Sequence, residues 1–319
     1  MNNPIIIFSQ AKAMNVLLNY ENIVVAVSGG ADSDIIVDII SKIKLLSYQS
    51  VRYVWFDTSL EYDATKKHLD FLEEKYGIKI ERIRAKKTVP IATREFGQPF
   101  LNKYVSEMIK RLQKHNFKWQ EKDFDALYEE YPDCKIALKW WCNDNIVSKK
   151  GNKSSFNISN NKWLKEFIIQ NPPNFKISNK CCTYAKKNPM HEFVKENQID
   201  LVVTGIRKAE GGSRKMAYKS CWNNIGKNNH SYMPILFYKD NDKEEYEMEY
   251  QILHSDCYTK YGLKRTGCAG CPFGRNFEFE LSVVEKYEPM LAKAIKNIFK
   301  DSYEYTRMYN EFKKFKETR

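Results

Sequence analysis

The chain has 319 residues, of which 43% are hydrophobic and 14% aromatic, so it can build a packed core. Its formal net charge is +12, which favours anionic partners. No stretch approaches the roughly eighteen apolar residues of a membrane span, and the apolar run at 5–8 is too short for a secretory signal. We therefore expect a cytoplasmic protein without a membrane partner.

Apolar and amphipathic runs alternate along most of the chain and predict strands alternating with helices. This alternation predicts an α/β fold with a doubly wound parallel sheet, whose ligands bind at the carboxyl ends of the strands. The strand pattern stops over 97–180, which we interpret as a helical insertion. Strands are expected at 22–28, 51–57, 78–84, 200–205 and 232–237, and helices at 33–46, 61–76, 189–198, 241–253, 278–299 and 301–317.

The first predicted strand leads into a glycine turn and then a helix, at Ser28-Gly29-Gly30-Ala31-Asp32-Ser33. Such a turn forms an anion site, because glycines let the backbone approach oxygen atoms and the helix N-terminus favours negative charge. The hydroxyls of Ser28 and Ser33 can add donors to a bound phosphate. The sequence therefore predicts a phosphate-binding loop at this point.

Eight cysteines form the second signal. Cys181 and Cys182 are adjacent, and Cys268 and Cys271 form a Cys-x-x-Cys followed by proline. In a reducing compartment such clusters indicate metal more often than disulfides. Adjacent cysteines fit poorly around one zinc ion but can each take a corner of a cubane, so a [4Fe–4S] cluster is favoured over zinc or unliganded thiols.

The loop resembles the PP-loop of the PAPS reductase-like adenine nucleotide alpha hydrolases, a superfamily of Rossmann-like fold. The resemblance extends over about 20–95 and 180–275 in the order of its motifs. It implies that Asp32 helps to place Mg²⁺ and ATP, that Asp57 and Thr58 border the adenosine, and that the segment from Gly205 through Arg207 to Arg214 binds phosphate. Further matching runs are Tyr232-Met-Pro-Ile-Leu236 and Tyr261-Gly-Leu-Lys-Arg-Thr-Gly-Cys268.

The resemblance also separates two activities. Sulfonucleotide reductases have a degenerate loop and a cysteine in the C-terminal tail, whereas this loop is complete and no cysteine follows Cys271. This favours an ATP pyrophosphatase that adenylylates an acceptor for sulfur transfer, similar to the enzymes of DNA phosphorothioation. A reductase that uses an external thiol and a noncatalytic nucleic-acid-binding subunit stay as alternatives.

We divide the chain into a PP-loop domain (1–96 and 181–240), a basic helical insertion (97–180) and a cluster segment with C-terminal helices (241–319). Residues 97–230 carry 24 basic and 13 acidic side chains, and aromatic residues are interleaved among them. Basic side chains neutralise phosphates and exposed aromatic rings stack on bases, so we expect a nucleic-acid acceptor. The alternative is that Trp140 and Trp141 are core residues and the lysines a solvated surface.

The sulfur must come from a donor, for which a cysteine desulfurase is a candidate partner. With four cysteines on iron, the sulfur would have to arrive as a persulfide on another cysteine, from a partner, or as free sulfide. Cys257 is the preferred carrier and Cys221 the next, although free cysteines more often pack in cores. His254 is read either as a general base or as a histidine that pairs with backbone at a helix end. In this account Asp32, Arg207, Arg214 and Cys257 are the catalytic residues.

Overall fold

The computed structural model divides into two compact units. The first, here called the sheet unit, consists of Met1–Lys86 and Ala185–Ala269. The second, the helical unit, consists of Lys87–Tyr184 and Gly270–Arg319. The structure describes residues 3–147, 151, 154–211, 217–226, 229–274 and 276–318.

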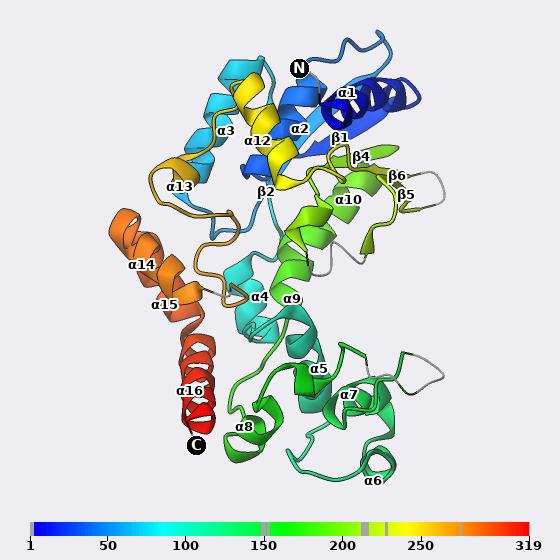
Figure 1. Ribbon diagram of the computed structural model, residues 1–319. Coiled ribbons are helices and arrows are strands. Elements are labelled where there is room, and N and C mark those ends of the chain that lie inside the picture. The colour runs from blue at the N-terminus through cyan, green and yellow to red at the C-terminus, as the bar shows by residue number, and fades with distance from the viewer. Residues whose placement is uncertain are drawn as a thin grey trace. The chain divides into compact units, whose positions relative to one another are not determined.

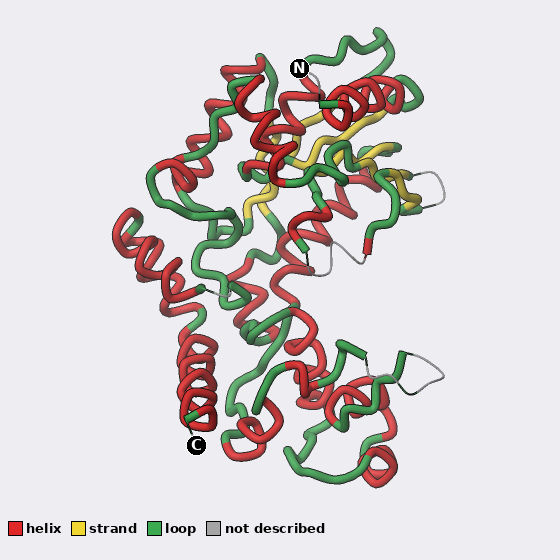
Figure 2. The backbone as a smooth tube through the Cα atoms, viewed as in Figure 1, coloured by secondary structure: helices red, strands yellow, loops and turns green. Residues whose placement is uncertain are grey.

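The sheet unit is built on a six-stranded sheet of order β3-β2-β1-β4-β6-β5 (Figure 1). Its neighbouring strands run parallel except β5 and β6, which are antiparallel. Figure 2 shows the strands in yellow with helices beside them. The doubly wound α/β prediction is confirmed. The strands are β1 (Asn22–Ala26), β2 (Ser50–Asp57), β3 (Ile80–Arg84), β4 (Leu201–Thr204), β5 (Trp222–Asn224) and β6 (His230–Tyr232).

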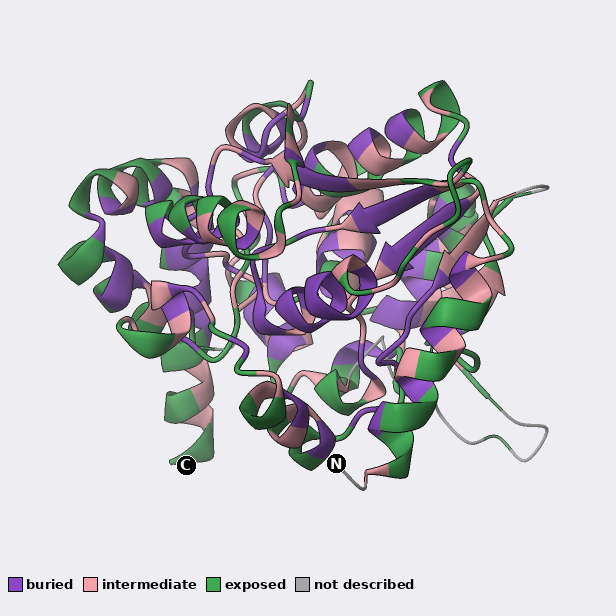
Figure 3. Cartoon of the chain, turned by 90° about the horizontal axis from the view of Figure 1, so that it is seen from above, coloured by how far each residue is buried: buried purple, intermediate pink, exposed green. Residues whose placement is uncertain are grey.

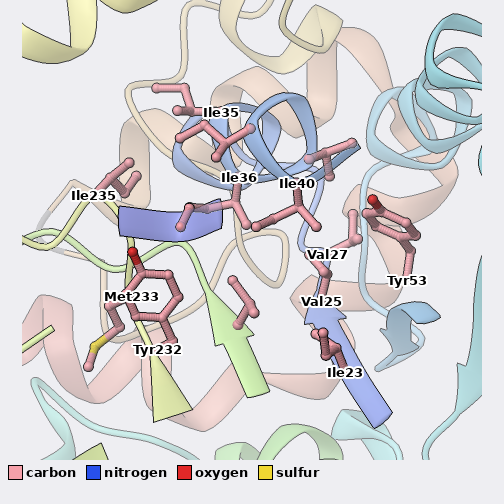
Figure 4. Packing of buried hydrophobic residues seen from close by; sticks show 14 of the residues in the cluster. Ile23, Val25, Val27, Ile35, Ile36, Ile40, Tyr53, Tyr232, Met233 and Ile235 are labelled. Atoms are coloured by element: carbon pink, nitrogen blue, oxygen red, sulfur yellow. The ribbon is translucent and has the colours of Figure 1, made fainter. Parts of the chain in front are cut away.

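Alternate residues of β1 pack into two cores, one on each face of the sheet. Ile23 and Val25 join the larger core, which includes Ile36 of α2 (Figure 4). Val24 joins the smaller core with Phe193 of α10. Because both faces are covered, the strand is apolar from Ile23 to Ala26, as parallel strands usually are. The helices of this unit are α1 (Pro4–Leu17), α2 (Ala31–Ser41), α3 (Asp63–Tyr76), α10 (Asn188–Glu196), α12 (Asp240–Glu249) and α13 (Asp256–Thr259).

The helical unit packs the insertion and the C-terminal helix around one aromatic core. Trp140 and Trp141 are fully buried there. Tyr305 and Tyr309 of α16 belong to the same core. The helices are α4 (Val89–Phe96), α5 (Lys103–Lys114), α6 (Phe124–Glu130), α7 (Lys135–Trp141), α8 (Leu164–Gln170), α9 (Lys180–Cys182), α14 (Phe277–Tyr287), α15 (Pro289–Ile298) and α16 (Lys300–Glu317). Figure 3 colours buried residues purple, including much of the strands of the sheet unit.

The structure corrects two element predictions. The strand expected at 232–237 ends at Tyr232, because Pro234 has no N–H for a ladder and the chain turns, with the N–H of Leu236 donating to Met233. The helix expected at 278–299 is two helices. It breaks at Glu288, since a residue before proline avoids helical geometry, and Pro289 starts α15.

Candidate functional site

The glycine turn lies where predicted, between β1 and α2. Gly29 has φ +64°, and a Cβ there would stand 2.6 Å from the Thr65 side chain, so both conformation and space call for glycine. The backbone N–H of Ser28 donates to the Ser33 hydroxyl over 3.0 Å, which closes the turn. Ser33 itself is buried. The turn is therefore held by its own serine as it enters the helix N-terminus.

Gly205, at the end of β4, lies directly against this loop. A Cβ on Gly205 would stand 2.7 Å from the Asp32 carbonyl oxygen and 3.1 Å from the Ser33 nitrogen. Both are backbone atoms, which cannot rotate away. The ends of the neighbouring strands β1 and β4 thus meet at the loop, as expected for a ligand site at the carboxyl edge of a parallel sheet.

Two cations converge on the loop carboxylate. Arg207 Nε lies 2.9 Å from Asp32 Oδ1, and Lys243 Nζ of α12 lies 3.4 Å from the same oxygen. Arg207 also pairs with Asp240 at 2.9 Å. Burial lowers the pKa of Arg207, but the charges of Asp32 and Asp240 and the hydrogen bonds to them together outweigh burial and raise the pKa. Lys243 was not identified from the sequence, since only the fold brings α12 to the loop.

A buried carboxylate lies two residues further along, still in the first turn of α2. Asp34 is fully buried, with Oδ2 2.7 Å from His254 Nδ1 and Oδ1 3.0 Å from His68 Nε2. His254 Nε2 reaches Glu247 Oε1 at 2.8 Å. Burial lowers the pKa of His254, but the hydrogen bonds to Asp34 and Glu247 raise it to about 9. His254 is therefore a protonated bridge between α2 and α12, and neither sequence interpretation of it is borne out by these contacts.

The segment before the Cys-x-x-Cys also touches the loop. The Tyr258 hydroxyl accepts a hydrogen bond from the Ala31 N–H at 3.1 Å and lies 3.4 Å from the Thr266 hydroxyl. A Cβ on Gly30 would stand 2.9 Å from that Thr266 oxygen. Tyr258 thus occupies one N–H at the start of α2.

Asp57 is the last residue of β2 and Thr58 follows it, at the same edge of the sheet. Thr58 is fully buried and donates to Glu61 at 2.5 Å, and its hydroxyl lies 3.5 Å from Cys268 Sγ. Burial raises the pKa of Glu61. Asp57 accepts from the Ser59 N–H at 2.7 Å. Cys268 therefore sits beside the residues expected to border the nucleotide.

The cysteines expected to bind a cluster are divided between the units. Cys268 belongs to the sheet unit, whereas Cys181, Cys182 and Cys271 belong to the helical unit. All eight cysteines lie in the described part of the chain and are thiols rather than disulfides. Among the described residues, no group of three or more His, Cys, Asp or Glu side chains is placed to hold a metal ion. Four thiols remain a donor set that suits iron–sulfur chemistry, so the cluster stays a prediction.

The proposed sulfur carrier and the proposed nucleic-acid contacts lie outside the loop and the cysteine pairs. Cys257 is fully buried, and its sulfur lies 3.6 Å from the Thr65 hydroxyl, which is the environment of a packing cysteine. Arg214 and the lysines at 149, 150 and 153 lie outside the described residues. Trp163 is 42% exposed. Stacking on Trp140 and Trp141 is excluded by their burial, because the apolar face of α7 faces the core.

The sequence matches the model of the phosphoadenosine phosphosulfate reductase domain over residues 22–131 and 113–273. The chain therefore belongs to this family, whose members are enzymes of the PP-loop type. No curated protein matches the sequence. No helix within the described residues has the length and apolar character to cross a membrane.

Solved structures that match this chain share little sequence with it, and those named next have TM-scores below 0.5. A phosphoadenylyl-sulfate reductase from Candida auris has 13% identity and a TM-score of 0.43, over 82% of this chain and 87% of its own. The tRNA thiolase NcsA from Methanococcus maripaludis, solved with its [4Fe-4S] cluster, has 11% identity and a TM-score of 0.40, over 95% and 79%. An NAD synthetase from Campylobacter jejuni has 12% identity and a TM-score of 0.36, over 94% and 93%.

Proposed function

We propose that this protein is an ATP pyrophosphatase that adenylylates an acceptor for sulfur transfer. The observation that carries the proposal is the complete phosphate-binding loop, whose Asp32 lies between Arg207 and Lys243 at the carboxyl edge of the sheet. A loop with a carboxylate and two cations suits a triphosphate that arrives with Mg²⁺. Arg207 and Lys243 would bind phosphate oxygens, and Asp32 would help to hold the Mg²⁺, which would neutralise phosphate charge.

In the proposed reaction an acceptor oxygen attacks the α phosphorus of ATP. The bond between the α phosphorus and the α–β bridging oxygen breaks, and pyrophosphate leaves with the electron pair. A sulfur nucleophile then attacks the activated acceptor atom, whose bond to oxygen breaks to release AMP. Adenylylation is needed because an oxide is a poor leaving group and AMP is a good one.

This chain's residues would bind and orient the nucleotide in that reaction. Arg207 and Lys243 exchange Asp32 for phosphate oxygens, which frees the carboxylate to face Mg²⁺ and leaves the cations to stabilise charge that develops on the leaving pyrophosphate. Ser28 and the loop backbone donate to phosphate. Arg214 is proposed as a further phosphate ligand, and Asp57 and Thr58 as the border of the adenosine.

We further propose a [4Fe–4S] cluster on Cys181, Cys182, Cys268 and Cys271. The donor chemistry supports it, and the position of Cys268 against Thr58 would put one ligand next to the nucleotide. A bound cluster would supply a covalent tie between residues 181 and 271, with every iron held by a protein thiolate. The transferred sulfur would then not come from the cluster. It would come from a persulfide on a partner such as a cysteine desulfurase, or from a persulfide on Cys257. Because Cys257 is buried, α13 would have to move to expose it.

For the acceptor we propose a nucleic acid. The excess of basic residues over 97–230 supports this, as does the exposed Trp163. The acceptor atom in a nucleic acid would belong to a backbone phosphate or to a tRNA base, and a small amide is the other acceptor that the chemistry allows. The second candidate function, reduction of an adenylyl sulfate by an external thiol, is favoured by the family to which the chain belongs.

Calorimetry with MgATP and with adenylyl sulfate separates these functions. We expect MgATP to bind more tightly than adenylyl sulfate. Asp32→Ala should weaken MgATP binding by at least tenfold, because the metal loses a ligand. Asp63→Ala, in an exposed ion pair with Lys66, is the matched control. Tighter binding of adenylyl sulfate would instead support the reductase. Tight nucleic-acid binding without any nucleotide binding would support the noncatalytic subunit.

A further inference from the structure

A cavity of about 520 Å³ lies in the sheet unit, away from the residues described for the nucleotide loop. Its volume is in the range of small-molecule sites, roughly 300–1,000 Å³. The N-terminal helix α1 forms one side of it, and the turn that follows β6 forms the other. Its lining includes Ile5, Phe8 and Lys12 of α1, Cys221, and Pro234 and Phe237 of the turn.

The lining is apolar, and its aromatic side chains are left open to solvent. Phe8 is 65% exposed and Phe237 is 50% exposed. The hydroxyls of Ser9 and Tyr238, which also line the cavity, lie 2.5 Å apart and satisfy each other. An occupant would therefore be held mainly by apolar contact along the body of the cavity.

Two cations lie near aromatic rings that line the cavity, and one of them, Lys12, lines it as well. Lys12 Nζ lies 3.1 Å from Cys221 Sγ and 5.7 Å from the Phe8 ring. Lys208 Nζ lies 4.9 Å from the Phe237 ring. Among the described residues, neither lysine has a carboxylate within ion-pair distance. A partly buried ammonium without a counterion is unfavourable, so the site is complementary to an anion.

We propose that this cavity binds a small amphipathic acid. Its hydrocarbon or aromatic body covers Phe8 and Phe237, and its single anionic head group pairs with Lys12 at the end marked by Cys221. The ligand differs in class from ATP, and the inference does not depend on the proposed reaction. A triphosphate is too polar for this lining, and a neutral lipid leaves Lys12 unpaired.

Titration calorimetry with decanoate, and with decanol as the neutral probe of equal chain length, tests the proposal. We expect decanoate to bind the full chain at least tenfold more tightly than decanol. Lys12→Met should weaken decanoate binding about tenfold and leave decanol unchanged, as expected for one charge-assisted contact. Lys66→Met, which removes an exposed lysine elsewhere in the same unit, should change neither.

A second variant tests the location without relying on charge. Phe8→Ala removes a largely exposed ring, so the fold is retained, and it should weaken the binding of both decanoate and decanol. Met290→Ala, which truncates an apolar residue that is 80% exposed, is its control. The proposal is overturned if decanoate does not bind the wild-type chain, if decanol binds equally well, or if Lys12→Met binds decanoate as the wild type does. Equal binding of the two probes would indicate a purely apolar docking surface.

Discussion

The protonated bridge at His254 makes the stability of the sheet unit depend on pH. The imidazole joins Asp34 of α2 to Glu247 of α12, over 2.7 and 2.8 Å. His68 faces the other oxygen of Asp34, Lys243 lies 3.5 Å from Glu247, and the Tyr258 ring packs against the imidazole. Removal of the proton from His254 leaves two carboxylates facing a neutral ring.

The size of this effect follows from the pKa of His254. Its value rises from the ordinary 6.5 to about 9, and each pKa unit corresponds to about 1.4 kcal/mol. The bridge therefore contributes about 3 kcal/mol, as an order of magnitude. Because the pKa is higher in the folded state, this stability is fully present below pH about 6.5 and is lost as the pH rises to about 9.

Imidazole NMR and urea unfolding can measure this contribution. The chain has five histidines, so the His254 resonance can be assigned from the spectrum of His254→Gln and should titrate near pH 9. The difference in unfolding free energy between wild type and His254→Gln should shrink by about 3 kcal/mol between pH 6.5 and 9. His191→Gln, at an exposed position, is the control. A resonance that titrates near pH 6.5, or a free-energy difference independent of pH, would show that the two carboxylates do not hold the proton on His254.

Three further predictions concern the loop, the cysteines and the basic segment. Gly205→Ala should displace the backbone at Asp32, weaken MgATP binding at least tenfold and lower the free energy of unfolding by about 1–3 kcal/mol. Gly77→Ala, the control, has open space around it and should leave MgATP binding unchanged. Equal MgATP affinities of the two variants would contradict the close approach of Gly205 to the loop. Metal analysis of anaerobically purified protein should give about four irons per chain, and the protein should absorb at about 400 nm. Cys268→Ser should lose the iron, whereas the control Cys142→Ser should keep it. One zinc per chain and no iron would rule out the cluster. The affinity for single-stranded DNA or RNA should fall roughly a hundredfold between about 50 and 200 mM salt. Neutralising Lys149, Lys150 and Lys153 together should weaken this salt dependence without changing the affinity for ATP. Absence of binding at the lower salt concentration would indicate that the basic segment is only a solvated surface.

The sequence predicted best what is decided locally. The strand, turn and helix around 22–41 are contiguous, and their glycines and apolar run determine them directly. Pro289 is a sequence signal for the break between α14 and α15, since proline restricts the residue before it. The break was nevertheless not predicted, because the apolar periodicity continues on both sides of the proline. The N-terminal helix α1 was not expected, because its apolar residues at 5–8 were considered only as a targeting signal.

Residues distant in sequence carried less signal. Asp34, His68 and His254 meet only in the folded chain, so their pairing could not be read from spacing. Lys243 likewise reaches Asp32 from another helix. Trp140 and Trp141 gave an ambiguous pattern, because adjacent aromatic residues suit both a core and a stacking surface, and the packing of α7 decided between them.

Product analysis of ATP turnover shows which phosphate bond of ATP the protein breaks. Anaerobically prepared wild-type protein is incubated with Mg²⁺, ATP labelled at the α phosphate, sulfide and single-stranded nucleic acid, and the nucleotides are separated by chromatography. The account predicts AMP and pyrophosphate in equal amounts, and their loss in Asp32→Ala, because the loop places the α phosphorus for attack. Formation of ADP and phosphate would contradict it, since the bond broken would then be that of the γ phosphate.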